Sequence, residues 1–373
     1  MMLADQNQIS HEFTASVEKF AQIHTSGAHA ALINNLHADM DVLRVDDLVF
    51  PVTVNSGKFN DAWVCSPLTT YWRYAQEEMS RYAHVMGRVL FLFICHVYGY
   101  LLKFARIDQA VTINNWALST NIYPALTNEQ ALTQMIAGAR RKWPGHGIWF
   151  RSLNQELNAD WLHALREQGL TLIPSRQVYL FDDLANGVRQ HANLQRDMHL
   201  LKSTTLLRVC DSEIRQQDYA RIAELYKLLY IDKYSQLNPE YTASFMQAWH
   251  TAGLLHFYAF KSDDGVLQAV VGLFQLQGVV TAPIVGYNTA LPRELGLYRL
   301  LMAAVFEHAI KNKLIVNLSA GAAHFKRLRG GKPAIEYSAV WSAHLPMRTR
   351  IVIACLGWLT TKIGIPVMKK YQL

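Results

Sequence analysis

The segment GYNTALPRELGLYRL at 286–300 combines residue types that suit an anionic ligand. An apolar run ends at Tyr287, Arg293 and Gly296 follow with two residues between them, and a helical pattern begins near Leu297. A glycine at a helix start lets the backbone approach a ligand, and the unpaired amides there favour an anion such as a pyrophosphate. We therefore assign Arg293, Gly296 and Leu297 to the binding of a phosphate-bearing co-substrate. A simple tight turn is the alternative reading of this glycine.

A second candidate is the basic segment SAGAAHFKRLRGGKP at 319–333. Its cations Lys326, Arg327 and Arg329 lie between small residues and a glycine pair, and strand-like runs flank the segment. Close approach of a phosphate needs such a combination of positive charge and small side chains. These three residues are our further candidates for binding the co-substrate, and a solvated surface loop is the alternative.

Two segments are dense in tyrosine and asparagine, YKLLYIDKYSQLNPEY at 226–241 and DQAVTINNWALSTNIY at 108–123. Such side chains can hold a polar substrate, or they can be core residues with satisfied hydroxyls. Our candidates for substrate binding are Tyr230, Tyr234, Asn238, Asn115 and Tyr287.

Other kinds of site have no support in the sequence. There is no GxSxG, HExxH or GxGxxG motif, the histidines lack metal-ligand spacing, and the four cysteines form no CxxC pair. We predict no metal, no permanently bound cofactor and a reducing compartment.

The positive charge is concentrated at the C-terminal end. The chain has a net charge of +7, but from Lys326 onward nine Lys and Arg face Glu336 alone, a balance of +8. Residues 1–325 therefore carry −1, which argues against a general nucleic-acid-binding surface.

Helical and strand-like patterns alternate along the chain. Apolar residues at three- and four-residue spacing predict helices at 13–36, 70–102, 128–142, 159–168, 217–230, 239–252 and 298–311. Strands are predicted at 110–113, 147–150, 170–173, 177–181, 206–210, 255–260, 266–277, 279–287, 314–318 and 335–341. The class is therefore α/β or α+β, and the two halves share a similar order of elements.

A length of 373 residues fits two domains. We place an N-terminal domain with a helical extension at 1–195, a C-terminal domain at 206–345 and a basic apolar tail at 346–373, with a polar linker at 185–205. The tail fits a buried core helix, a membrane-surface helix or a membrane span, because glycines and a proline interrupt its apolar run.

The region from Leu206 to Trp341 resembles the second half of double-domain GNAT proteins. The resemblance rests on the strand and helix after Tyr287, the ending LSAGAAHFKRLRGG with its Phe325–Lys326 pair, and a closing strand. Double-domain GNAT acyltransferases and FemAB-type aminoacyl-tRNA-dependent transferases are the two relatives in question. The resemblance implies two GNAT-like domains, each a mixed, mostly antiparallel sheet flanked by helices.

The resemblance also implies acyl transfer to an amine, with acyl-CoA or an acyl carrier protein thioester as co-substrate. Such a site needs an oxyanion donor, an acid for the leaving group and a base for the amine. Tyr298 is our candidate acid, and Asp232 and Glu336 are candidate bases. Tyr298 also stands where the family's phosphate loop has a small residue.

We therefore expect an N-acyltransferase that acts on the amine of a small molecule or amino acid. The rivals are aminoacyl transfer from tRNA and a non-catalytic binding protein with the same fold. We expect a cytoplasmic protein, or one at the inner face of a membrane through its tail. An acyl carrier protein and a membrane surface are the expected partners, and nucleic acid other than tRNA is not expected.

Overall fold

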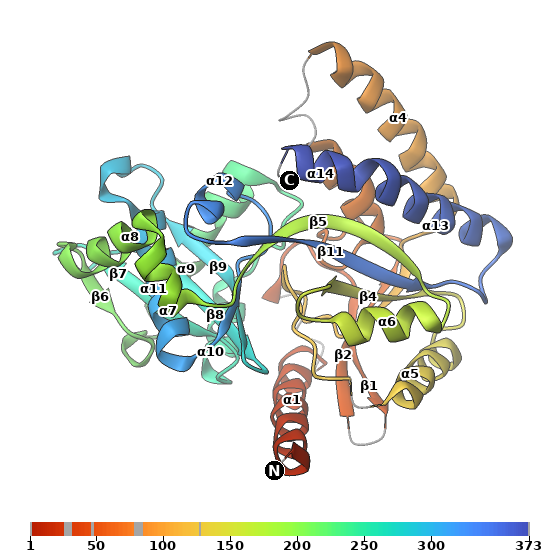
Figure 1. The fold of residues 1–373 in the computed structure, drawn as a ribbon, viewed down its shortest axis with the longest axis horizontal. Coiled ribbons are helices and arrows are strands. Elements are labelled where there is room, and N and C mark those ends of the chain that lie inside the picture. The colour runs from red at the N-terminus through yellow and green to blue at the C-terminus, as the bar shows by residue number, and fades with distance from the viewer. Residues whose placement is uncertain (1, 26–31, 46–47, 78–84, 127, 372–373) are drawn as a thin grey trace.

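The computed structural model describes residues 2–25, 32–45, 48–77, 85–126 and 128–371. Its strands form one mixed sheet in the order β1-β2-β3-β4-β11-β5-β10-β9-β8-β7-β6 (Figure 1). They are β1 (Asp39–Val45), β2 (Leu48–Ser56), β3 (Gln109–Ile113), β4 (Gly147–Asn154), β5 (Thr171–Phe181), β6 (Leu207–Val209), β7 (His256–Lys261), β8 (Leu267–Leu276), β9 (Val279–Tyr287), β10 (Ile315–Asn317) and β11 (Lys332–Trp341).

Helices cover both faces of this sheet. The α-helices are α1 (Met2–His24), α4 (Val85–Phe104), α5 (Glu129–Lys142), α6 (Ala159–Glu167), α7 (Leu184–Gln190), α8 (Ala192–Ser203), α9 (Asp218–Lys227), α10 (Ala243–Thr251), α11 (Leu297–Asn312), α12 (Ala323–Arg327), α13 (Met347–Leu359) and α14 (Ile365–Tyr371). Short turns of other helix types are η1 (Thr69–Tyr74), η2 (Asp211–Glu213), η3 (Leu228–Tyr234), η4 (Arg293–Leu295) and η5 (Thr360–Gly364).

The centre of the sheet repeats one unit twice. The first arm is β3-α5-β4-α6-β5, and the second arm is β9-α11-β10-α12-β11. In each arm a helix joins two parallel strands, β3 with β4 and β9 with β10. The last strand of each arm then crosses into the other half, so that β11 pairs with β4 and β5 pairs with β10.

The crossing strands β5 and β11 pair with each other, antiparallel, through the middle of the molecule (Figure 1). The predicted α/β class, with a mixed and mostly antiparallel sheet flanked by helices, is confirmed. The strands of the two halves form one continuous sheet, because the last strand of each arm pairs with strands of the other arm.

The segment that we predicted as a linker, 185–205, is helical instead. It forms α7 and α8, and Leu194 and Leu201 of α8 are buried beside α11. Most of the polar residues that marked it as a linker lie on the outer face of an amphipathic helix, whereas Asp197 is buried. Strands β1 and β2 were absent from our prediction, and the two runs at 170–173 and 177–181 are one strand.

The C-terminal tail is a continuous helical stretch from α13 through η5 to α14. Its inner side packs on β5, where Ile353 and Leu356 are buried. The glycine at 357 permits this approach, because a Cβ there would lie 2.8 Å from Thr171 Cγ2 and 3.1 Å from the carbonyl oxygen of Leu172. Within the described ranges it is the one helix long and apolar enough to cross a membrane, and only 22% of its apolar window is buried.

Candidate functional site

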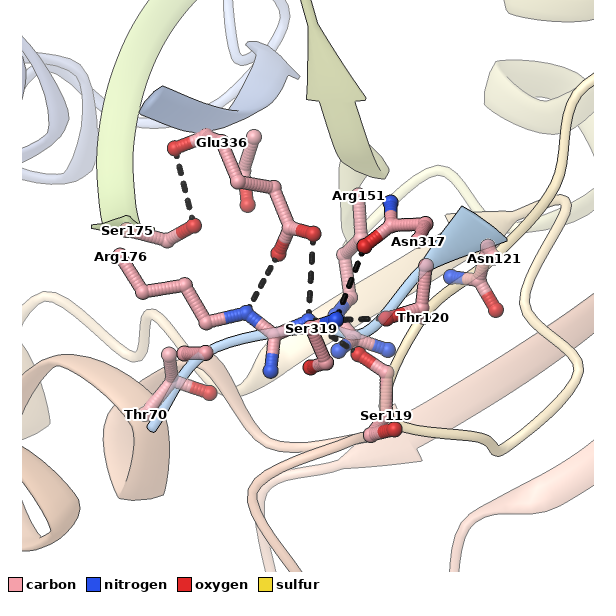
Figure 2. A network of polar contacts seen from close by, with 12 residues as sticks. Thr70, Ser119, Thr120, Asn121, Arg151, Ser175, Arg176, Asn317, Ser319 and Glu336 are labelled. Atoms are coloured by element: carbon pink, nitrogen blue, oxygen red, sulfur yellow. Dashed lines mark hydrogen bonds and ion pairs between the residues drawn. The ribbon is translucent and has the colours of Figure 1, made fainter. Parts of the chain in front are cut away.

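A buried ion pair lies where the two crossing strands meet. Arg176 of β5 faces Glu336 of β11, and its Nε and Nη2 donate to the two carboxylate oxygens at 2.8 and 3.1 Å. Figure 2 shows that the guanidinium also reaches the loop after β3, where Nη2 donates to the carbonyl oxygen of Ser119 and to Thr120 Oγ1. Arg176 therefore connects the two arms.

A second buried arginine adds a positive charge beside this pair. Arg151 of β4 donates through Nη1 to the carbonyl oxygen of Val64 and to Asn115 Oδ1, at 2.8 and 3.0 Å. Its Nη2 is buried and has no hydrogen-bond partner among the described residues. The indole of Trp63 lies against both guanidinium groups. The distance from the ring centroid to the Cζ atom is 5.0 Å for Arg151 and 4.9 Å for Arg176. Two arginines and one glutamate leave this centre with an excess positive charge.

Tyrosines of the second half gather around Tyr298, and one of them, Tyr230, lies near Arg176. Tyr230 of η3 lies 6.0 Å from Tyr234, and Tyr287, at the end of β9, lies 6.5 Å from Tyr298 (ring centroids). Burial is the main cause that raises the pKa of Tyr230 and Tyr298, so both phenols are protonated at neutral pH. Tyr298 packs edge-on against Phe325, at 4.8 Å between ring centroids. The phenol of Tyr298 has no hydrogen-bond partner within the described chain, which leaves it available to a ligand.

The start of α11 has the geometry that the sequence predicted. Gly296 has φ +62°, a conformation that glycine adopts without strain, and a Cβ there would lie 2.9 Å from Leu200. No described side chain caps the first turn of α11, and that turn holds no acidic residue. Arg293 is exposed just before it, and Leu297 is buried. This helix end can therefore accept an anion.

The basic segment at 319–333 differs from the phosphate-binding loop that we predicted. It contains the short helix α12, and two of its cations bind groups of the protein itself. Lys326 is buried and donates to the carbonyl oxygens of Leu318, Ser319 and Ala320 at 2.8, 3.2 and 2.8 Å. Burial and, secondarily, the nearby Arg176 lower the pKa of Lys326 to about 7.

Arg329 is buried as well. It pairs with the buried Asp197 of α8, which also accepts from Arg299 Nε at 2.7 Å. Arg327 alone among our three predicted cations is exposed. Of this segment, only Arg327 presents a free charge to a ligand.

The remaining candidates are placed as follows. Asp232 lies on the exposed side of η3, whereas the carboxylate of Glu336 is held by Arg176. Asn238 accepts from Trp63 Nε1 at 2.9 Å and donates to the carbonyl oxygen of Tyr230 at 2.9 Å. Asn115 is completely buried and hydrogen-bonds to Arg151. Both asparagines thus shape the site through protein contacts.

A cavity of about 410 Å³ adjoins this centre between the two arms. Thr120 and Asn317 line it, and both belong to the network of Figure 2, where Asn317 Oδ1 accepts from the amide of Ser319 at 2.9 Å. Ser152 and Asn154, at the end of β4, also line it. Their Oγ and Nδ2 atoms are buried and find no partner in the part of the chain that the structure describes. The cavity therefore offers hydrogen bonds to a polar ligand.

Sequence reasoning missed Trp63, Arg151, Arg176 and the cavity. The available signal was a single arginine inside each of two apolar strands, GIWFRSLN and TLIPSRQVYLF. A charged residue in such a strand is costly unless it is paired, so it marks a buried polar site.

Comparisons with known proteins agree with this architecture. Residues 189–327 match the family model described as an acetyltransferase (GNAT) domain. The fold resembles the C-terminal domain (DUF2156) of a putative lysylphosphatidylglycerol synthetase from Agrobacterium fabrum, at 10% identity and a TM-score of 0.52 over 95% of both chains.

Two further solved structures are similar at lower scores. A conserved protein of unknown function from Bacteroides thetaiotaomicron has 12% identity and a TM-score of 0.49, over 91% of this chain and 97% of that one. L-PGS from Bacillus licheniformis has 13% identity and a TM-score of 0.48, over 66% and 82%. No curated protein matches the chain in sequence. The predicted GNAT-type fold is confirmed, and residues 189–327 match a GNAT domain model.

Proposed function

We propose that this chain, which has a GNAT domain in its second half, is an N-acyltransferase that moves an acyl group from a thioester donor to an amine. The observation that carries the proposal is the uncapped start of α11, whose first turn places Tyr298 near Tyr230, Tyr234 and Tyr287. An anion-accepting helix end next to a protonated phenol is what a thioester with a phosphate-bearing carrier requires.

The donor in this proposal is acyl-CoA or an acyl carrier protein. Its phosphates would lie at the backbone amides of Leu297 and Tyr298. Arg293 is an exposed cation four residues before Leu297, and the exposed Arg327 follows Phe325, which packs on Tyr298. Lys326 and Arg329 act indirectly, because they hold the loop after β10 and the end of α12 in place.

The acceptor in this proposal is a small polar amine held in the 410 Å³ cavity, where Ser152 Oγ and Asn154 Nδ2 would bind its polar groups. The neutral amine attacks the thioester carbonyl carbon, a tetrahedral oxyanion forms, and the carbon–sulfur bond then breaks. Tyr298 gives its proton to the leaving thiolate. Asp232 is the base that we propose for the amine, because Glu336 is bound to Arg176.

The test is a thiol-release assay with a panel of acyl-CoA donors of increasing chain length and a panel of amines and amino acids. The proposal expects amine-dependent release of one free thiol per acylated product. The same panel of acceptors is tested in parallel with an acyl carrier protein thioester and with an aminoacyl-tRNA as the donor.

Aminoacyl transfer is the second candidate, and the fold similarity to the domain of a putative lysylphosphatidylglycerol synthetase favours it. If product forms with aminoacyl-tRNA as the donor and with no thioester, aminoacyl transfer would replace the thioester proposal. The absence of product with every donor would support a binding protein with the same fold.

A further inference from the structure

Large apolar side chains are exposed on two helices that lie on the same side of the sheet. On α4 they recur at three- and four-residue spacing, so they share one face of that helix. Others continue along the tail on α13 and η5. Each of the following is 46–63% exposed: Tyr100, Leu101, Phe104, Ile351, Trp358 and Ile363. A soluble chain seldom leaves so many large apolar groups together in water, which marks this face as an interaction surface.

The two helices form one continuous face. Thr349 of α13 donates through its hydroxyl to the carbonyl oxygen of Ala105, directly after α4, at 2.9 Å. The guanidinium of Arg348 lies 5.1 Å from the centre of the Phe104 ring. Beneath them Leu102, Ile353 and Leu356 share one buried cluster. Figure 1 shows the C-terminal end of α4 meeting α13, and we call the exposed apolar side chains of α4, α13 and η5 the α4–α13 face.

The charge around this face is predominantly positive. The tail contributes Arg348, Arg350, Lys362, Lys369 and Lys370, and residues 342–373 contain no acidic side chain. A cavity of about 270 Å³ opens at the C-terminal end of α4, and its lining includes Lys58, Arg73, Lys103 and Arg106 against the single carboxylate of Asp108. That carboxylate accepts from the hydroxyl of Ser66 at 2.8 Å and the amide of Leu68 at 2.7 Å, so the cations remain in excess.

We propose that the α4–α13 face docks on the surface of an anionic phospholipid bilayer. The apolar side chains would enter the interface between headgroups and acyl chains, and the cations would meet lipid phosphates. The tail lies flat against β5 through Ile353, Leu356 and Gly357, so it rests in the plane of the membrane and does not cross it. A symmetric contact with a second copy would bring the same uncompensated cations together, which disfavours that occupant.

The test is co-sedimentation of the full chain with phosphatidylcholine vesicles that contain or lack phosphatidylglycerol. The expected result is partition into the anionic vesicles only, weakened by added salt. Trp358→Glu and Ile351→Glu should each lower the partition coefficient about tenfold, because a carboxylate replaces an inserted apolar group. Leu207→Glu is the matched control, since Leu207 is 56% exposed on β6 at the far edge of the sheet, and it should stay within about twofold.

Two outcomes would overturn the proposal. One is a folded protein, by circular dichroism, that binds neither kind of vesicle. The other is a dimer in sedimentation velocity that Trp358→Glu converts to a monomer, which would give the face to a second copy. The readout needs no catalysis, so it stands or falls separately from the acyltransferase proposal.

Discussion

The two arms of the sheet have the same order of elements but opposite helix starts. Helix α5 of the first arm begins at Asn128, whose Oδ1 accepts from the amide of Gln130 at 2.7 Å, and Glu129 follows in its first turn. Helix α11 of the second arm begins at Gly296, with no side-chain cap in the described structure and no acid in its first turn. The first helix start is closed by its own side chains, and the second is open to an anion.

The loops that precede these helices differ in the same sense. After β3 the chain folds inward, and Trp116 is fully buried with its Nε1 donating to Asn114 Oδ1 at 3.0 Å. After β9 the shorter loop stays at the surface, where Arg293 is exposed. One copy of the unit has thus become part of the core, while the other keeps the features of a ligand site.

The largest expected effect is on catalysis in the second arm. Tyr298→Phe should lower kcat about 10²–10⁴-fold, since it removes the proposed acid, and change the KM for the donor little. The melting temperature should hold, because the phenol has no hydrogen-bond partner in the described chain. Steady-state thiol release measures both constants.

The control for this variant is Tyr258→Phe, which removes a phenol on β7 that is hydrogen-bonded to His308. It should leave kcat unchanged. A loss of less than about threefold for Tyr298→Phe would remove Tyr298 from the mechanism.

In the first arm the largest effect should be on stability. Trp116→Ala should lower the free energy of unfolding by about 3–5 kcal/mol, because it empties a fully buried site between Phe20 and Phe274. Urea denaturation measures this, and Trp116→Phe should retain most of the stability. A loss below about 1 kcal/mol for the alanine variant would mean that this loop does not fill the core.

A charge reversal in each arm tests which arm binds the acyl-CoA donor. Arg293→Glu should weaken acyl-CoA binding about tenfold by calorimetry, because it places a carboxylate beside the proposed phosphate site. Arg141→Glu makes the same change at an exposed position of α5 and should have no effect. Equal weakening by both variants would contradict the assignment of the donor to the second arm.

The smallest effect concerns the edge of the sheet beyond the second arm. Burial alone would raise the pKa of Asp211, but hydrogen bonds from His250, His256 and the amide of Phe257 outweigh it and hold the pKa below its usual value. The hydrogen bond to Asp211 raises the pKa of His256.

The Asp211 contribution to stability is therefore present above pH ~4 and lost on acidification, and that of His256 is present below pH ~6.5 and lost as pH rises. Asp211→Asn should lower the melting temperature most between about pH 4 and 6.5 and less at pH 8. A difference that is the same at pH 5.5 and pH 8 would contradict this.

The sequence was most informative where local patterns decide the structure. The run Val279–Tyr287, the glycine at 296 and the helix after it all lie where the pattern predicted them. Such features depend on neighbours in the chain, so one sequence contains them.

The sequence pattern could not predict contacts between residues that are far apart in the chain. Asp197 pairs with Arg329 132 residues later, and Lys326 donates to carbonyl groups that only the folded loop brings together. Nothing local distinguishes these buried cations from a solvated charge cluster. The exchange of β5 and β11 between the arms was equally hidden, because it depends on which strands become neighbours in space.

Hydrogen exchange with and without acyl-CoA locates the donor site, because it reports on both arms in one experiment. We expect slower exchange in the presence of the donor at 288–300, around the start of α11, and unchanged exchange at 114–130, around the start of α5. Protection at 114–130, or protection at neither segment, would contradict the assignment of the donor site to the second arm.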